Sequence, residues 1–210
     1  GYLGMTGVDG DHLAKMPVAM IDVLAAHQLK EGLLLALMHR AKSGKGAYVE
    51  VALEDAALTG LINQATNWLM AGHVAKPLGT LHTNIAPYGE VFACADGKRI
   101  VLAVGSNAQF IKLCDALALP ELKDAADFAE NAGRVKHRER LAAALAPAIA
   151  AAPRPELLQR LQLAGVPAGA VNSRDAALSS PAARRMTVEE MIDGVRTLRI
   201  RGNAFRSTYY

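Results

Sequence analysis

A run of apolar residues between Val23 and Arg40 limits what this chain can fold into more than any other stretch. Its spacing predicts one helix, and its composition leaves little room for a polar face. A helix that is apolar nearly all round is buried in a larger protein, so we expect a core element here. Basic residues followed by Gly44 and Gly46 predict where the helix ends. The apolar positions are Val23, Leu24, Ala25, Ala26, Leu29, Leu33, Leu34, Leu35, Ala36, Leu37 and Met38.

Asp22 stands directly before this helix and is the candidate catalytic residue. A carboxylate there can accept hydrogen bonds from the free N–H groups of the first turn, and the helix dipole favours its charged form. Both effects keep Asp22 ionised at neutral pH, as a nucleophile or a base must be. The residues leave a second interpretation open, in which Asp22 is only an N-cap, the commonest role of Asp at such a position.

Composition argues against several classes of function. The net charge is +3, and the densest basic cluster, Arg134–Arg140, contains Glu139 and is expected to be a solvated helix face. No basic stripe with interleaved aromatic residues is present, so we expect no nucleic-acid partner. Cys94 and Cys114 lack metal-ligand spacing, and we expect free thiols, no metal and a cytoplasmic location. No apolar run approaches the ~20 residues that a membrane span needs.

The remaining pattern predicts a helix–strand–helix order that suits an α/β fold, with a strand at 47–52 and a helix at 54–71. Two more strands, 88–94 and 98–104, should form a hairpin through Ala95-Asp96-Gly97. Residues 1–18 are expected to be a loop, and the absence of an initiator Met suggests that the chain begins within a longer gene product. The later elements expected are a helix at 107–117, a polar connection at 120–127, helices at 134–151 and 155–164, an extended segment at 166–171, a short helix at 172–178, a strand at 195–200 and an end at 207–210 without a packing element.

Four blocks of sequence, in order, carry a resemblance to a known family. The first, Pro17 to Ala52, holds an Ile-Asp pair, the apolar helix, a Ser-Gly-Lys-Gly turn and Tyr-Val-Glu-Val. A single block is weak evidence for any family. Together, the four blocks make the chain resemble the class III CoA-transferases, or CaiB/BaiF family, from about Gly4 to Phe205. The other three blocks are Asn84-Ile85-Ala86-Pro87-Tyr88 with Asp96-Gly97 and Leu102-Ala103-Val104-Gly105; Asn131 with Arg134 and Val135; and Ala164-Gly165-Val166-Pro167-Ala168-Gly169.

The resemblance implies both a fold and an activity. It implies the end of a large Rossmann-like domain at 1–77, a small α/β domain at 78–165, and a linker at 166–210 that returns to the large domain. Asp22 would be the catalytic residue, forming first an acyl anhydride and then a CoA thioester. Acyl-CoA and a carboxylic acid would be the substrates, with no metal and no other cofactor, and the protein would be a homodimer with no membrane partner. The family's N-terminal half, which holds most CoA contacts, has no counterpart here, so the CoA-binding residues stay unassigned.

Two other functions stay open. The family includes α-methylacyl-CoA racemases, which usually carry Glu where Asn107 stands; Asn cannot take up a proton at neutral pH, which favours transfer. The chain could also be a non-catalytic segment for acyl-CoA binding or dimerisation. His82 follows a loose match, Gly79-Thr80-Leu81, to a glycine loop of some transferases and is expected to be structural, although histidine is a frequent acid or base. His27 follows Asp22 by five residues, and side chains at that spacing on a helix do not face each other.

Overall fold

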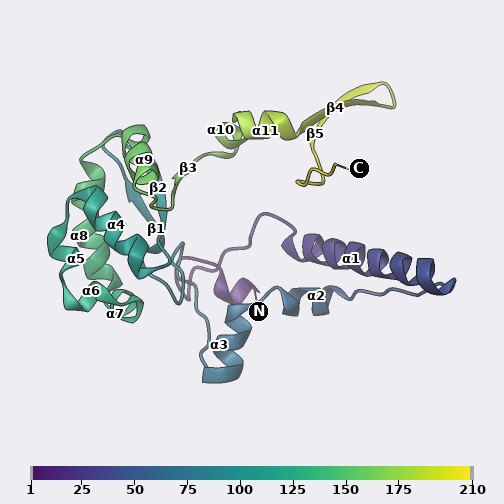
Figure 1. Ribbon diagram of the computed structural model, residues 1–210, viewed down its shortest axis with the longest axis horizontal. Helices are drawn as coiled ribbons and strands as arrows, with labels where there is room; N and C mark the ends of the chain where they lie inside the picture. The colour runs from purple at the N-terminus through teal and green to yellow at the C-terminus, as the bar shows by residue number, and fades with distance from the viewer. Residues whose placement is uncertain (1, 209–210) are drawn as a thin grey trace. The chain divides into compact units, whose positions relative to one another are not determined.

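A computed structural model describes residues 2–208, which mix helix with small antiparallel sheets, as expected for the α/β class (Figure 1). The chain forms two compact units, the first ending at Ile85 and the second beginning at Ala86. The three-part domain division and its Rossmann-like component stay predictions. Across the described residues, none of the helices is both long enough and apolar enough to cross a membrane.

The first unit is organised on the long helix α1 (Met20–Ser43), which confirms the helix expected at 23–40. Gly44 ends it in a left-handed conformation at φ 73°, with its N–H donating to the carbonyl of Arg40. Only glycine adopts this geometry without strain, which explains the stop signal. The expected burial of α1 is wrong for the described chain, because none of its residues is buried and Leu35 is 60% exposed.

The rest of the first unit differs from expectation in two places. Residues 47–52 are not a strand, because no other strand of the described chain lies beside them to accept their hydrogen bonds. The helix expected at 54–71 is two helices, α2 (Leu53–Thr59) and α3 (Asn63–Ala71), separated where Ile62 has φ 47°. Gly60 lies at the break, and a Cβ there would meet the Tyr2 hydroxyl at 2.2 Å. The loop expected at 1–18 includes a short 3-10 helix, η1 (Tyr2–Met5).

The second unit contains a three-stranded antiparallel sheet in the order β1 (Tyr88–Ala93), β2 (Arg99–Ala103), β3 (Ala168–Val171). The predicted hairpin between β1 and β2 is confirmed, with Gly97 at φ 71° in the turn. Helices α4 (Asn107–Leu117), α8 (Arg138–Ala150) and α9 (Arg154–Leu163) pack on the sheet and one another (Figure 1). Their apolar faces share one core, which includes Ile100, Leu102, Phe110, Leu113, Leu141, Leu145, Ile149, Leu157 and Leu161.

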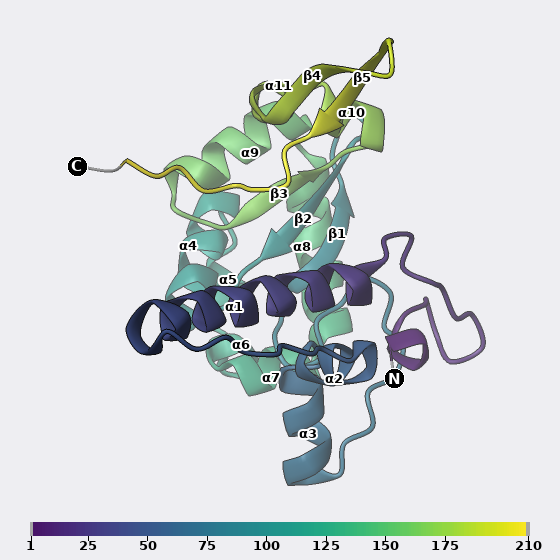
Figure 2. The ribbon, with the colours of Figure 1, turned by 90° about the vertical axis from the view of Figure 1, so that its right-hand side faces the viewer.

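Shorter elements complete the second unit. The connection expected at 120–127 holds two helical turns, α5 (Pro120–Lys123) and α6 (Ala126–Ala129). The helix expected at 134–151 is divided at His137 into α7 (Asn131–Lys136) and α8. After α10 (Arg174–Leu178), the sequence did not predict α11 (Pro181–Met186) or β4 (Thr187–Ile192), which pairs with the expected strand β5 (Val195–Ile200) (Figure 2). Residues 207–208 have no regular structure, and 209–210 lie outside the described residues.

The expectation of a solvated basic cluster is wrong for Arg134, because its side chain is completely buried. Its guanidinium lies 4.7 Å from the centre of the Phe110 ring. Its Nε donates to the carbonyl of Ala86 at 2.9 Å, and Asn131 Oδ1 accepts from the N–H of Ala86 at 3.2 Å. Two residues of the third sequence block, Asn131 and Arg134, therefore hold Ala86, which belongs to the second block. The sequence pattern does not reveal this, because the acceptors of Arg134 are mainly backbone carbonyls, which no residue type marks. These carbonyls belong to Ala86, Phe128 and Ala129.

Glu90 is a second buried charged residue in this unit. It lies on β1, is 5% exposed, and its Oε1 is 4.0 Å from Nη1 of Arg138. Removal from water raises the pKa of the Glu90 carboxyl, an effect that the Arg138 charge opposes only in part.

We expect Glu90 to make the fold less stable as pH rises. The raised pKa means that the folded state holds a proton that the unfolded state loses near the ordinary value of 4.5. The free energy of unfolding should therefore fall as pH rises from about 4.5 through the folded-state pKa of Glu90. Urea unfolding of the Glu90→Gln variant at several pH values should lack this component. Equal pH dependence in the variant and the unmodified protein would contradict the assignment.

Candidate active site

Asp22 lies in the first turn of α1, as its third residue. The helix begins at Met20 after an N-cap at Ala19, and no side chain makes a capping hydrogen bond. The N-cap interpretation of Asp22 is therefore wrong, because the helix starts two residues before the carboxylate. The residue is exposed and remains at the positive end of a 24-residue helix.

A pocket of about 560 Å³ opens beside Asp22, within the first unit. Its wall joins the N-terminal segment, the approach to α1 and one residue of α2. Two of its polar side chains have internal partners: the Tyr2 hydroxyl donates to the carbonyl of Ala57 at 3.0 Å, and the Thr6 hydroxyl donates to the carbonyl of Tyr2 at 3.2 Å. The lining residues are Tyr2, Leu3, Thr6, Lys15, Met16, Val18, Ala19, Met20, Ile21, Asp22 and Ala57.

Lys15 is the residue of this pocket that the sequence analysis missed. It precedes Asp22 by seven residues and lies outside any helix or strand, so no periodicity marks it. The available sequence signal was a basic residue in the loop that leads to the candidate nucleophile. Lys15 and Asp22 are the two charged residues among those that line the pocket.

The two candidate histidines do not line the Asp22 pocket as the structure describes it. Nδ1 of His82 accepts the backbone N–H of Asn84 at 3.1 Å, which fits the structural role expected for it. The loop before it is held to the N-terminal segment, since the N–H of Gly79 donates to the carbonyl of Gly7 at 2.8 Å. His27 lies along α1, with its Nδ1 3.2 Å from Nζ of Lys30.

Asn107 is the residue on which the expectation of transfer rather than racemisation is based. Its Oδ1 accepts from Nη2 of Arg134 at 2.8 Å, and its Nδ2 donates to Oε2 of Glu130 at 2.7 Å. The two ends of the amide therefore have different partners, buried Arg134 at the oxygen and Glu130 at the nitrogen. The arrangement suits an amide at this position, and an amide cannot take up a proton at neutral pH.

The cysteines are free thiols, as expected, and both are buried. Burial raises the pKa of the Cys114 thiol to about 11, so that it stays protonated at neutral pH. A protonated, buried thiol is a poor nucleophile. Among the residues that the structure describes, no group of His, Cys, Asp and Glu side chains could hold a metal ion.

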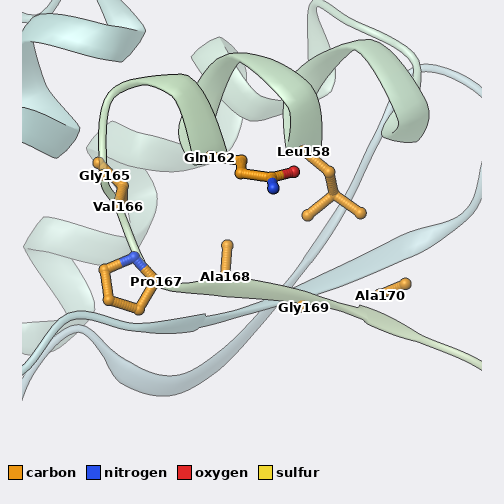
Figure 3. A pocket seen from close by; sticks show the side chains of 8 residues that line it. All are labelled: Leu158, Gln162, Gly165, Val166, Pro167, Ala168, Gly169 and Ala170. Atoms are coloured by element: carbon orange, nitrogen blue, oxygen red, sulfur yellow. The ribbon is translucent and has the colours of Figure 1, made fainter. Parts of the chain in front are cut away.

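A second pocket, of about 460 Å³, lies in the other unit between α9 and β3 (Figure 3). Leu158 points from α9 towards the strand, and Ala168 points back towards the helix (Figure 3). Most of the fourth sequence block, Gly165 to Gly169, forms its wall. Gln162 contributes the polar side chain among its lining residues, so this pocket offers neither a nucleophile nor a charge.

Comparisons with known proteins agree on one family. A family model described as CoA-transferase family III matches residues 1–209. The chain is 32% identical over 205 residues to a succinate–glutarate CoA-transferase of Agrobacterium fabrum, covering 94% of the chain and 51% of that protein. It is 33% identical over 160 residues to an acetyl-CoA:oxalate CoA-transferase of Acetobacter aceti, covering 75% and 41%. The chain thus spans about half the length of the curated relatives that it matches.

Solved structures give the same result for the fold. A CaiB/BaiF family protein from Brucella suis has 33% sequence identity and a TM-score of 0.69, over 97% of this chain and 53% of that one. Rv3272 from Mycobacterium tuberculosis has a TM-score of 0.82 over 100% of this chain and 55% of that one; its 24% identity supports similarity of fold alone.

Proposed function

The chain belongs to CoA-transferase family III, and from this premise we propose that it carries the catalytic residue of an enzyme that moves CoA between carboxylic acids. Acyl-CoA and a free carboxylic acid are the two substrates. The relatives compared above are named for succinate and glutarate, and for acetyl-CoA and oxalate. The whole protein is proposed to work in the cytoplasm as a homodimer, in which a second copy would help to cover α1.

The observation that carries this proposal is the position of Asp22. Its carboxylate lies in the first turn of α1 and lines a largely apolar pocket of about 560 Å³. A pocket with apolar walls and few polar groups is a typical small-molecule site.

Transfer then proceeds through two kinds of covalent intermediate on Asp22. A carboxylate oxygen attacks the thioester carbonyl, the C–S bond breaks, and an acyl–aspartyl anhydride forms with release of CoA thiolate. The thiolate attacks the aspartyl carbonyl carbon, which expels the donor acid and leaves an aspartyl–CoA thioester. The acceptor carboxylate repeats both steps in reverse, which forms the new acyl-CoA and restores Asp22. Each step exchanges one activated acyl bond for another, so the aspartyl–CoA thioester keeps the activation of the original thioester when the donor acid leaves.

The racemase alternative is less well supported by the site. Racemisation needs an acid and a base on the two sides of the carbon next to the thioester. Asn107 cannot supply either, because an amide neither takes up nor releases a proton at neutral pH. Exchange of the α-proton in deuterated water without an acceptor acid would favour racemisation. Tight acyl-CoA binding with no covalent product would favour a binding or dimerisation segment.

We expect hydroxylamine to trap the intermediate on Asp22 in the whole protein. Acyl-CoA should convert Asp22 into an anhydride or thioester, and hydroxylamine should replace the leaving group to give an aspartyl hydroxamate. Mass spectrometry of the tryptic peptide from Met16 to Lys30 would locate it. The Asp22→Ala protein should give no such product. An unmodified peptide, despite measurable acyl-CoA binding, would contradict covalent transfer.

A further inference from the structure

Lys15 and Asp22 line the same pocket but do not neutralise each other. Within the described residues, no ion pair or hydrogen bond of the Lys15 side chain is found. The pocket's hydroxyl groups, on Tyr2 and Thr6, already donate to backbone carbonyls. The side chains that remain available to a ligand are therefore one ammonium group and one carboxylate, in a mainly apolar wall.

This arrangement suits a ligand with two different ends. The end that reacts must present an acyl carbon to Asp22, as the proposed function requires. The other end should be anionic, because an ammonium group in a mainly apolar wall favours a negative partner. Between them the apolar side chains Leu3, Val18 and Met20 suit methylene groups.

We propose that Lys15 binds the second carboxylate of a short dicarboxylic acid while the first reacts at Asp22. The phosphates of CoA offer similar chemistry. They are separated from the thioester by the whole pantetheine arm, however, whereas a second carboxylate lies only a few methylene groups from the reacting carbon. The second carboxylate is thus the anion that fits a pocket shared with the nucleophile. This inference rests on the proposed function, and it makes Lys15 a residue that determines substrate specificity.

The experiment compares two acceptor acids with one CoA donor in the whole protein. Glutarate carries the second carboxylate, and valerate replaces it with a methyl group. In the Lys15→Met variant, the ratio of kcat/KM for glutarate to that for valerate should fall about tenfold or more, since a charge-assisted hydrogen bond is lost. Lys15→Arg should restore much of the ratio, because it keeps the charge. Lys45→Met, at an exposed lysine outside the pocket lining, should leave the ratio as it was.

The other outcomes separate this inference from the proposed function. An equal fall for both acceptors, with a raised KM for the CoA donor, would overturn the dicarboxylate role and assign Lys15 to a CoA phosphate. An unchanged ratio in Lys15→Met would also overturn it. In both cases the unmodified protein still transfers CoA, so the proposed function stands. Failure of the unmodified protein to transfer CoA to any acid would instead remove the function on which the inference rests.

Discussion

The Asp22→Ala variant should lose CoA transfer by a factor of about 10⁴ or more, measured as kcat in the whole protein with a CoA donor and an acceptor acid. The reason is chemical: alanine has no oxygen that can attack the thioester, so neither covalent intermediate can form. Asp22→Asn should be as inactive, since an amide of the same shape is a poor nucleophile. Full activity in either variant would exclude Asp22 as the nucleophile.

The same substitutions should leave the fold intact. Asp22 is exposed and makes no capping hydrogen bond, so its main contribution to stability is its charge near the helix dipole. At an exposed site that contribution is about 0.3–1 kcal/mol. Glu31→Gln, on the same helix and also exposed, is the matched control, and its transfer activity and circular dichroism should stay unchanged. If the Asp22 variants unfold, their inactivity would not test the role of Asp22 as the nucleophile. The activity of the Asp22→Glu variant, which keeps a carboxylate, would then be measured instead.

Elements that depend on local signals could be predicted from the sequence. The stop of α1 follows from a glycine that adopts positive φ, and the β1–β2 hairpin from an Asp-Gly turn. Helix α4 was predicted at its observed bounds, and its first turn carries a capping box between Ser106 and Gln109. Elements that depend on a distant partner could not be predicted. The segment 47–52 alternates like a strand but has no neighbouring strand in the described chain, and the break between α2 and α3 lies where Tyr2, distant in sequence, approaches Gly60 closely.

The candidate site shows the same division. The sequence located Asp22 at the start of α1, since acidic residues favour that end of a helix, but placed the helix start three residues too late. Lys15 could not be assigned, because only the folded N-terminal segment brings it to the pocket of Asp22. Arg134 was misassigned for a related reason: a basic residue among others is typical of a solvated face, and nothing local shows that backbone carbonyls surround it.

We expect Arg134→Met to destabilise the fold by about 3–5 kcal/mol in the free energy of unfolding. Methionine fills much of the volume but donates no hydrogen bond. The carbonyls of Ala86 and Phe128, and Oδ1 of Asn107, would each lose a donor while remaining in place. Replacing a buried charge with an apolar side chain can be neutral when its partners are replaced too. Here most of the partners are backbone groups that no substitution removes, so the loss should be large.

Arg140→Met is the matched control for Arg134→Met, because it removes the same side chain from the same basic cluster. Arg140 pairs with Asp127 at the surface and lies 4.8 Å from the centre of the Phe128 ring, with about half of its side chain exposed. Its loss should lower stability by no more than about 1 kcal/mol. Urea unfolding followed by far-ultraviolet circular dichroism would measure both variants, since the single tryptophan, Trp68, lies in the other unit. Equally small losses in the two variants would mean that the hydrogen bonds of Arg134 to its carbonyl partners contribute little to the fold. A large loss confined to Arg134→Met would show that the buried hydrogen bonds of Arg134 stabilise the second unit. One of them fixes Ala86, the first residue of that unit.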